Sequence, residues 1–487
     1  MALRRPAPGF WLPAEVRDTD LALRLRRWTA AGLFLRVLLL PIGVTSDTLA
    51  VYWRAHVIAF DGTVFRDYLV NAGAHVVHAA WLWIARPFLP SPDGLWTDPW
   101  WWDGSYALEQ PIMDQFLARS DLLRTVAVLK VPYLLADVAA GIILLHLVAR
   151  WWSRRPAPSN GGGGDGRSLD ARAARRVTVT WAGWMLSPFG IYATMWFGRY
   201  ESFPVLLVLL ALLFLERDRP LIGSLLLGIA ITMRTYPIAF VPVLALLAST
   251  RPVLQARFAA VALAPFAAVQ VFGMSLGASG ELAALSERGL TDNWLAFTLQ
   301  PGSGPGIPLT PAVLLCLVVV VAGRQWGWWG HPIPVADAWR WLVLAHLGIF
   351  AFSHFSVHYV MWLTPAIALL IGRGERRGII PLHLAQGAGV VVASLLFMDA
   401  RPFLGALGGL GQTAMTLLPP FLGVSVERAQ VLGGLAWSGF VVATLAIAIP
   451  AARDAWTGGA WTARAQSDGA WSAHGDDAEG AKAEQPA

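Results

Sequence analysis

Residues 150–155 read Arg-Trp-Trp-Ser-Arg-Arg, and beyond a glycine-rich stretch residues 172–176 read Arg-Ala-Ala-Arg-Arg. This is the strongest concentration of arginine beside apolar runs in the chain. Short loops rich in Lys and Arg lie on the cytoplasmic face of membrane proteins. The segment 150–176 is therefore predicted to be a cytoplasmic linker, and it constrains the number of crossings before it.

The composition supports a membrane protein. The 487 residues are 56% hydrophobic and only 14% charged, and the mean hydropathy is +0.53. A soluble protein of this length needs more charge on its surface. Because the arginines sit in short loops, the net charge of +6 does not indicate nucleic-acid binding. The single cysteine, Cys316, excludes disulfides and thiolate metal sites.

The basic linker decides how residues 69–90 are interpreted. We expect 1–27, polar and arginine-rich, to be a cytoplasmic amphipathic segment. Spans at 28–44 and 122–148 then return the chain to the cytoplasm, whereas a third crossing at 69–90 would place the linker outside. Residues 45–120 are therefore predicted to be one extracytoplasmic loop with interfacial helices, its tryptophans at headgroup depth.

The rest of the chain predicts a bundle. Residues 28–450 form the predicted transmembrane domain, and the polar segment 451–487 is predicted to be a disordered cytoplasmic tail. Residues 219–249 fit a hairpin of short helices or one tilted helix; the arginines after them favour the hairpin. The fold class is an all-α polytopic membrane protein of about 12 helices. The later spans are predicted at 177–197, 203–215, 219–232, 236–249, 257–276, 308–323, 339–353, 358–371, 379–398 and 430–450.

This topology collects chemically useful residues in the extracytoplasmic loops. Asp47 follows the first span and suits a general base, although Thr45-Ser46-Asp47 also suits a helix N-cap. Arg199 and Glu201 share a tight turn, where they either orient a sugar or phosphate or pair with each other. Arg234 is isolated between apolar runs and either binds a lipid phosphate or extends to the headgroups.

Two histidines and a charged pair complete the candidates. His354 and His358 lie four residues apart in a polar break, so they fit substrate hydrogen bonding, a structural role or metal ligation. Because a third ligand is missing, the metal interpretation is weak. Lys130 and Asp137 lie in the second span and are expected to pair inside the bundle.

Several stretches together resemble the GT-C superfamily of polyprenol-phosphate-sugar-dependent glycosyltransferases. The resemblance is nearest to bacterial alpha-1,2-mannosyltransferases and to the GPI mannosyltransferase I branch. Each stretch is short, so their order and shared placement carry the resemblance. They are Arg36-Val-Leu-Leu-Leu-Pro41 continuing to Ser46-Asp47, residues 129–137, Phe197-Gly-Arg-Tyr-Glu-Ser202, Met233-Arg-Thr-Tyr-Pro237, and His358-Tyr-Val-Met-Trp-Leu-Thr-Pro365.

The resemblance implies a GT-C-like bundle with juxtamembrane helices in the first outer loop, and Asp47 as the catalytic base. Several members carry a second acidic residue in this loop, whereas Thr48 and Leu49 follow Asp47 here. A metal requirement is therefore doubtful, and no cofactor is expected. The turn also differs from the family pattern at Arg199 and Glu201, where Gln or Asp is frequent.

The function expected from these features is sugar transfer with inversion, with mannose as the sugar. The donor would be a polyprenyl-phosphate sugar and the acceptor a hydroxyl of a lipid or glycan. The leaving phosphate would contact Arg234, His354 and His358. Membrane lipids are expected partners, the location is the plasma membrane, and both termini are cytoplasmic. A transporter or flippase is the alternative. Such a protein should carry polar groups near the middle of the bilayer and two halves of related sequence, and neither is evident here. A non-catalytic assembly subunit is the third possibility.

Overall fold

The computed structural model shows an all-helical membrane protein, as the composition predicts. It describes residues 11–16, 18–64, 71–89, 116–153, 169, 171–277, 298–299, 307–353, 357–373, 378–397 and 426–479. Within these ranges the strands are limited to β1 (Thr298–Leu299) and β2 (Ile307–Pro308), an antiparallel pair in which Thr298 lies opposite Pro308.

The described helices range from one turn to more than fifty residues. In chain order they are α1 (Thr19–Leu39), α2 (Ser46–Phe60), α3 (Ala72–Ala85), η1 (Arg86–Phe88), α5 (Leu122–Ser153), α6 (Ala171–Met185), α7 (Pro188–Ile191), η3 (Tyr192–Trp196), α8 (Ser202–Leu215), α9 (Pro220–Met233), η4 (Tyr236–Phe240), α10 (Val241–Ala248), α11 (Pro252–Ser275), α13 (Leu309–Gln325), η6 (Val335–Asp337), α14 (Ala338–Phe352), η7 (Val357–Leu363), α15 (Thr364–Arg373), α16 (Ile379–Phe397) and α19 (Val426–Glu479).

Four of the described helical segments are long and apolar enough to cross a membrane by themselves. They are Leu122–Ser153, Pro252–Ser275, Val335–Phe352 and Val431–Thr457. Shorter apolar helices surround them, including α8, α9 and α13. A multi-pass membrane protein is thereby confirmed, whereas the number of about 12 spans stays a prediction.

The first helix begins earlier than the predicted span at 28. The Asp18 carboxylate caps α1 by accepting a hydrogen bond of 2.9 Å from the Asp20 N–H. Leu21 and Leu25 are buried in the bundle. This part of the expected amphipathic segment is therefore continuous with α1.

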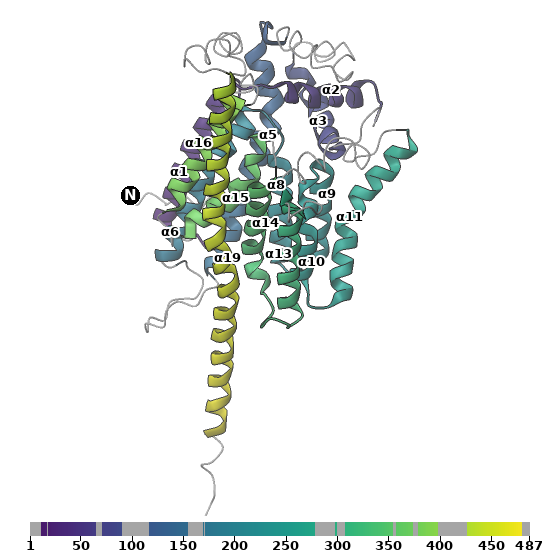
Figure 1. Ribbon diagram of the computed structural model, residues 1–487. Helices are drawn as coiled ribbons and strands as arrows, with labels where there is room; N and C mark the ends of the chain where they lie inside the picture. Colours follow the sequence, from purple (N-terminus) through teal and green to yellow (C-terminus); the bar gives the residue numbers. More distant parts are fainter. Residues whose placement is uncertain are drawn as a thin grey trace, which may run out of the picture.

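Helices α2 and α3 lie at one end of the bundle, and α2 runs across it (Figure 1). They pack against each other, and α3 also contacts α9. The 14 residues of α3 span about 21 Å at 1.5 Å per residue, less than the about 30 Å of a bilayer core. Helices α8 and α9, which were predicted to be spans, have the same length, so the prediction that 69–90 does not cross the membrane stays a prediction.

The last helix runs along the bundle and past the end opposite α2 (Figure 1). It packs against α16 and α14. Two guanidinium groups hold it: Arg324 donates to the Trp456 carbonyl at 3.1 Å and Arg340 to the Asp454 carbonyl at 3.3 Å. Helix α19 continues to Glu479, into the segment predicted to be a disordered tail.

The buried charges of α5 do not pair with each other, so the expected Lys130–Asp137 pair is wrong. Seven residues along a helix correspond to a rise of about 10 Å, which is too far for a contact. Asp137 instead forms a fully buried ion pair with Arg36 of α1. Lys130 Nζ donates to the carbonyls of Gly43, at 2.6 Å, and Met195, at 2.5 Å.

Two glycines allow the chain between α1 and α2 to approach the turn after η3. A Cβ on Gly43 would lie 1.6 Å from the Trp196 carbonyl oxygen. Gly198 has a φ of +76°, a conformation that other L-residues rarely adopt. The start of α2 is therefore fixed beside this turn.

Candidate functional site

The beginning of α2 is bonded to the turn that follows η3. Thr45 Oγ1 donates to the Phe197 carbonyl at 3.1 Å, and Thr48 Oγ1 donates to the Gly198 carbonyl at 2.7 Å. Both hydroxyls are buried. The two threonines therefore determine where the intervening Asp47 lies.

Asp47 lies beside Arg199 of this turn. The Arg199 Nη1 is 3.5 Å from the Asp47 carboxylate and donates to the Asp47 main-chain carbonyl at 3.1 Å. The N-cap of α2 is Thr45, whose side chain makes no capping bond, and Asp47 falls in the first turn. Its carboxylate therefore pairs with a guanidinium and does not cap the helix. The side chain of Asp47 is 45% exposed and that of Arg199 only 9%.

Glu201, at the start of α8, is completely buried and accepts hydrogen bonds from two helices. Its Oε1 receives bonds from Arg234 Nε and Nη2 at 2.8 and 2.5 Å, and its Oε2 receives one from Trp362 Nε1 at 2.6 Å. Arg234 is itself buried. The interpretation in which Arg234 extends to the lipid headgroups is therefore wrong, and so is a local pair between Glu201 and Arg199.

Aromatic rings enclose the Arg234 guanidinium. Its central carbon lies 4.7 Å from the centre of the Tyr200 ring and 5.1 Å from that of Tyr359. Trp362 is stacked between Tyr359 and Tyr236, with ring centres at 4.4 and 3.6 Å. Burial raises the pKa of Tyr200 to about 12, so its hydroxyl stays protonated at neutral pH. None of these four rings was among the predicted site residues, although all four lie within the stretches that carried the resemblance.

Two buried side chains at this site have unused hydrogen-bonding atoms. Neither ring nitrogen of His358 nor the Nε of Arg199 has a hydrogen-bond partner in the part of the chain that the structure describes. The His358 ring lies between Phe197 and Tyr359, at 4.8 and 4.3 Å, and its Nε2 is 3.7 Å from Glu201 Oε1. Buried polar atoms normally have partners, so these nitrogens keep hydrogen-bonding capacity for a ligand or a water molecule.

His354 lies outside the described residues. The metal interpretation of the two histidines therefore gains no support, because the described ranges hold no group of three His, Cys, Asp or Glu side chains arranged for a metal.

Charged side chains of both signs gather around the site. His75 Nε2 is 3.2 Å from Arg54 Nη1, a contact in which the guanidinium donates. Burial, followed by nearby cations, lowers the pKa of His75 well below its usual value, so the imidazole is neutral. Three guanidinium groups and two carboxylates gather near α2, α3 and the turn after η3: those of Arg54, Arg199, Arg234, Asp47 and Glu201.

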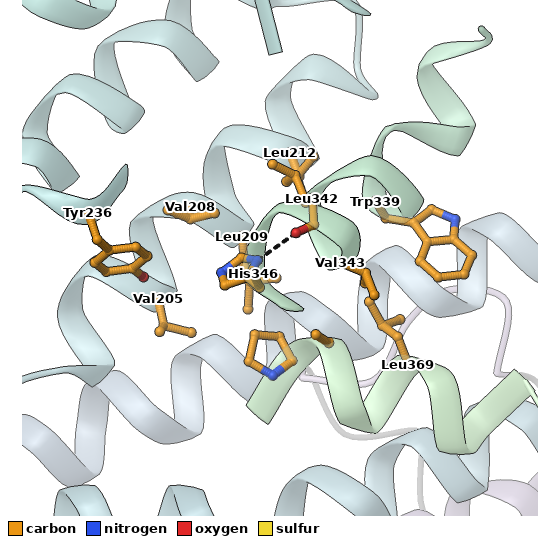
Figure 2. Close-up of a pocket in the computed structure, with 12 residues that line it drawn as sticks. Val205, Val208, Leu209, Leu212, Tyr236, Trp339, Leu342, Val343, His346 and Leu369 are labelled. Atoms are coloured by element: carbon orange, nitrogen blue, oxygen red, sulfur yellow. Dashed lines mark hydrogen bonds between the residues drawn. The ribbon is translucent and has the colours of Figure 1, made fainter. Parts of the chain in front are cut away.

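A separate apolar cavity lies between α8, α14 and α15 (Figure 2). The volume open to the centre of a water-sized sphere is about 20 Å³, room for about one water molecule. Within it, His346 Nδ1 donates to the Leu342 carbonyl at 2.7 Å, and Tyr236 stands at the edge (Figure 2). This cavity is too small for a lipid, so the polar cluster is the better candidate site.

One protein-family comparison gives a match. Residues 102–300 match the family described as GPI transamidase subunit PIG-U. The match covers less than half of the chain and includes Arg199, Glu201 and Arg234, while Asp47 and His358 lie outside it. No curated protein and no solved structure matches.

This match overturns the function expected from the sequence. The matched family is a subunit of a transamidase, so the hexosyltransferase assignment, with mannose as its sugar, is wrong. The transporter or flippase alternative is wrong for the same reason. The polyprenyl-phosphate sugar donor was expected only as part of the transferase assignment, so this expected partner is wrong as well. Membrane lipids remain plausible partners, and the GT-C-like architecture stays a prediction.

Proposed function

We propose that this chain is a non-catalytic membrane subunit that binds a GPI-type lipid for a protein-to-lipid transfer reaction carried out by other subunits. The observation that carries the proposal is the match of residues 102–300 to a GPI transamidase subunit. The matched range includes Glu201 and Arg234, the buried ion pair at the centre of the polar cluster. A non-catalytic role was the third possibility left open by the sequence.

The chemistry of the cluster supports binding of a phosphate. Arg234 gives two N–H groups to Glu201, so its part is to hold Tyr200 and Tyr359 in place. Arg199 Nε and the His358 ring keep hydrogen-bonding capacity. A guanidinium and an imidazole are suitable donors to a phosphate oxygen. This assignment keeps His358, which the sequence already suggested as a phosphate contact, and replaces Arg234 with Arg199.

Asp47 has a positioning role in this proposal. Its carboxylate and main-chain carbonyl both face Arg199 Nη1. They hold Nη1 beside the start of α2, while Nε has no hydrogen-bond partner among the described residues. No proton transfer is required of Asp47, because the chemical step belongs to another subunit.

The distribution of arginines supports an extracytoplasmic site. Arg324 and Arg340 lie at one end of α13 and α14 and bind the Trp456 and Asp454 carbonyls of α19, whereas the polar cluster lies beside α2 at the other end (Figure 1). By the positive-inside rule the first end is cytoplasmic. Both termini would then be cytoplasmic; the plasma membrane stays the expected location.

The proposal is tested by lipid binding to the purified chain. Native mass spectrometry would compare a GPI-type lipid with the same lipid after removal of its phosphate. Losing a hydrogen bond to a charged group corresponds to roughly a tenfold weaker affinity or more. We expect that loss for Arg199→Gln and His358→Gln with the phosphorylated lipid only.

Arg257→Gln is the matched control. Arg257 is exposed on α11, so the substitution removes the same charge at a position away from the site. Equal binding by all variants, or equal binding of the lipid without phosphate, would show that Arg199 and His358 do not bind the lipid phosphate. Transfer of a sugar by the purified chain alone would contradict a non-catalytic role.

A further inference from the structure

Helix α3 has one buried and one exposed face. His75, His78 and Leu82 are buried against the neighbouring helices. The opposite face, continued by η1, exposes large apolar side chains, with Trp83 and Phe88 exposed by 65% and 62%. We call this surface the α3 apolar face; it consists of Val76, Trp83, Ile84 and Phe88.

Two arginines lie beside the α3 apolar face. Arg124, at the start of α5, donates through Nε and Nη2 to the Phe88 carbonyl at 3.0 and 2.7 Å. Its side chain remains exposed. The Arg86 guanidinium lies 5.2 Å from the centre of the Phe60 ring. Aromatic and aliphatic residues bordered by guanidinium groups are typical of a surface at the depth of lipid headgroups.

The α3 apolar face continues into a surface that lipid covers. Because Arg124 binds Phe88, η1 lies against the start of α5. Helix α5 is a candidate membrane span, and on it Leu123 and Leu135 are exposed. Exposed leucines on a spanning helix contact acyl chains. The occupant of the adjoining α3 apolar face is therefore the same lipid layer.

The buried face of α3 connects this surface to the polar cluster. His78 Nε2 shares a hydrogen bond of 2.7 Å with the Tyr133 hydroxyl, and His75 contacts Arg54 of α2. The α3 residue Gly73 packs so closely on Thr232 that a Cβ would lie 2.3 Å from its Oγ1. Movement of α3 would therefore disturb α2 and the end of α9.

We propose that α3 and η1 form a phospholipid-binding surface in the leaflet at the α2 end of the bundle. The α3 apolar face enters the boundary between headgroups and acyl chains, while the exposed Arg124 binds the phosphate of an anionic phospholipid. This binding holds α2 and α3 in place beside the polar cluster. It is independent of the GPI-type lipid in the proposed function.

Site-directed fluorescence tests the depth of this surface. Cys316 is the only cysteine, so Cys316→Ser gives a cysteine-free background. A polarity-sensitive dye would be attached at Trp83→Cys and, as a matched position, at Thr63→Cys, since Thr63 is exposed in the loop after α2. In vesicles of phosphatidylcholine and phosphatidylglycerol with brominated acyl chains, we expect strong quenching at 83 and little at 63. Equal quenching at the two positions would overturn the proposal.

Charge removal tests the anionic preference. Each basic residue near an anionic surface strengthens binding roughly fivefold. Arg124→Gln should therefore reduce phosphatidylglycerol retained by the purified protein roughly fivefold. Arg119→Gln is the control, because Arg119 already pairs with Asp121 at 3.1 Å.

Two outcomes would contradict the surface. Unchanged retention of phosphatidylglycerol in Arg124→Gln would show that Arg124 does not bind the lipid phosphate. A dye at 83 that is exposed to water in vesicles, and protected only when partner proteins are added, would assign the α3 apolar face to a protein interface. Neither outcome bears on the binding test for Arg199 and His358.

Discussion

Replacing Glu201 with Gln tests the buried ion pair most sharply. The two side chains have nearly the same shape, so the substitution removes the charge and leaves the volume. Glu201 is completely buried and accepts bonds from Arg234 Nε, Arg234 Nη2 and Trp362 Nε1, all within 2.8 Å. Glu201→Gln leaves the buried guanidinium without its carboxylate.

The expected loss follows from the burial of both charges. Breaking a buried pair by removing one partner destabilises a protein by about 3–5 kcal/mol. Removing both partners is less harmful, because no uncompensated charge remains. We therefore expect Glu201→Gln to lose about 3–5 kcal/mol, and Glu201→Gln with Arg234→Gln to lose clearly less than the sum of the two single variants.

The measurement is reversible unfolding in mixed micelles, followed by far-ultraviolet circular dichroism as sodium dodecyl sulfate is added. Asp61→Asn is the matched control, because Asp61 is an exposed carboxylate at the end of α2; it should change the unfolding free energy by less than about 0.5 kcal/mol. A change of that small size for Glu201→Gln, or simple additivity in the double variant, would refute the reasoning.

Three further predictions concern the framework around the site. Asp137→Asn should destabilise the protein by about 3–5 kcal/mol, and adding Arg36→Met should recover part of that loss in the same unfolding assay; no recovery would argue against the pair. Gly43→Ala places a Cβ 1.6 Å from a carbonyl oxygen and should lose about 3 kcal/mol or fail to fold, whereas Gly434→Ala, with open space around it, should be tolerated. Burial lowers the pKa of His78 to about 3, so between pH 6.5 and pH 4 the unfolded chain takes up a proton that the folded chain does not. Stability is then fully present above pH 6.5 and falls by about 1.4 kcal/mol per pH unit below it. His78→Gln should remove that part of the slope, and an unchanged slope would show that His78 is accessible to protons.

The arginine pattern predicted more of the architecture than of the contacts. The basic linker after α5 led to the exclusion of 69–90 as a span, and the structure has only the short α3 there. The same topology predicted that Asp47, Glu201 and Arg234 share one end of the bundle, and they do lie together. The side of the membrane on which a loop lies is predicted from the lengths of the apolar runs and the positions of the arginines, which are local properties of the sequence.

The pairings could not be predicted because they join distant parts of the chain. Sequence spacing suggested Lys130 with Asp137, whereas Asp137 meets Arg36 on another helix. In the same way, Arg199 and Glu201 are neighbours in a turn but bind partners on α2 and α9. A polar residue in an apolar run indicates that some partner exists. Only the packing of the helices determines which one.

The function was mistaken for a related reason. The stretches around Asp47, Arg199 and Arg234 are short, and charged residues at one end of a helical bundle suit a transferase or a lipid-binding subunit equally. A shared arrangement of helices does not determine the chemistry. The match of residues 102–300 to a GPI transamidase subunit favours binding over catalysis.

The most direct test of the account is photocrosslinking of a GPI-type lipid carrying a photoreactive group next to its phosphate. The purified chain would be irradiated in nanodiscs and digested, and the labelled peptides identified by mass spectrometry. The account predicts label on the peptides that contain Arg199 and His358, with competition from unlabelled phosphorylated lipid. Label confined to the cavity between α8, α14 and α15, or label that phosphorylated lipid does not displace, would contradict it.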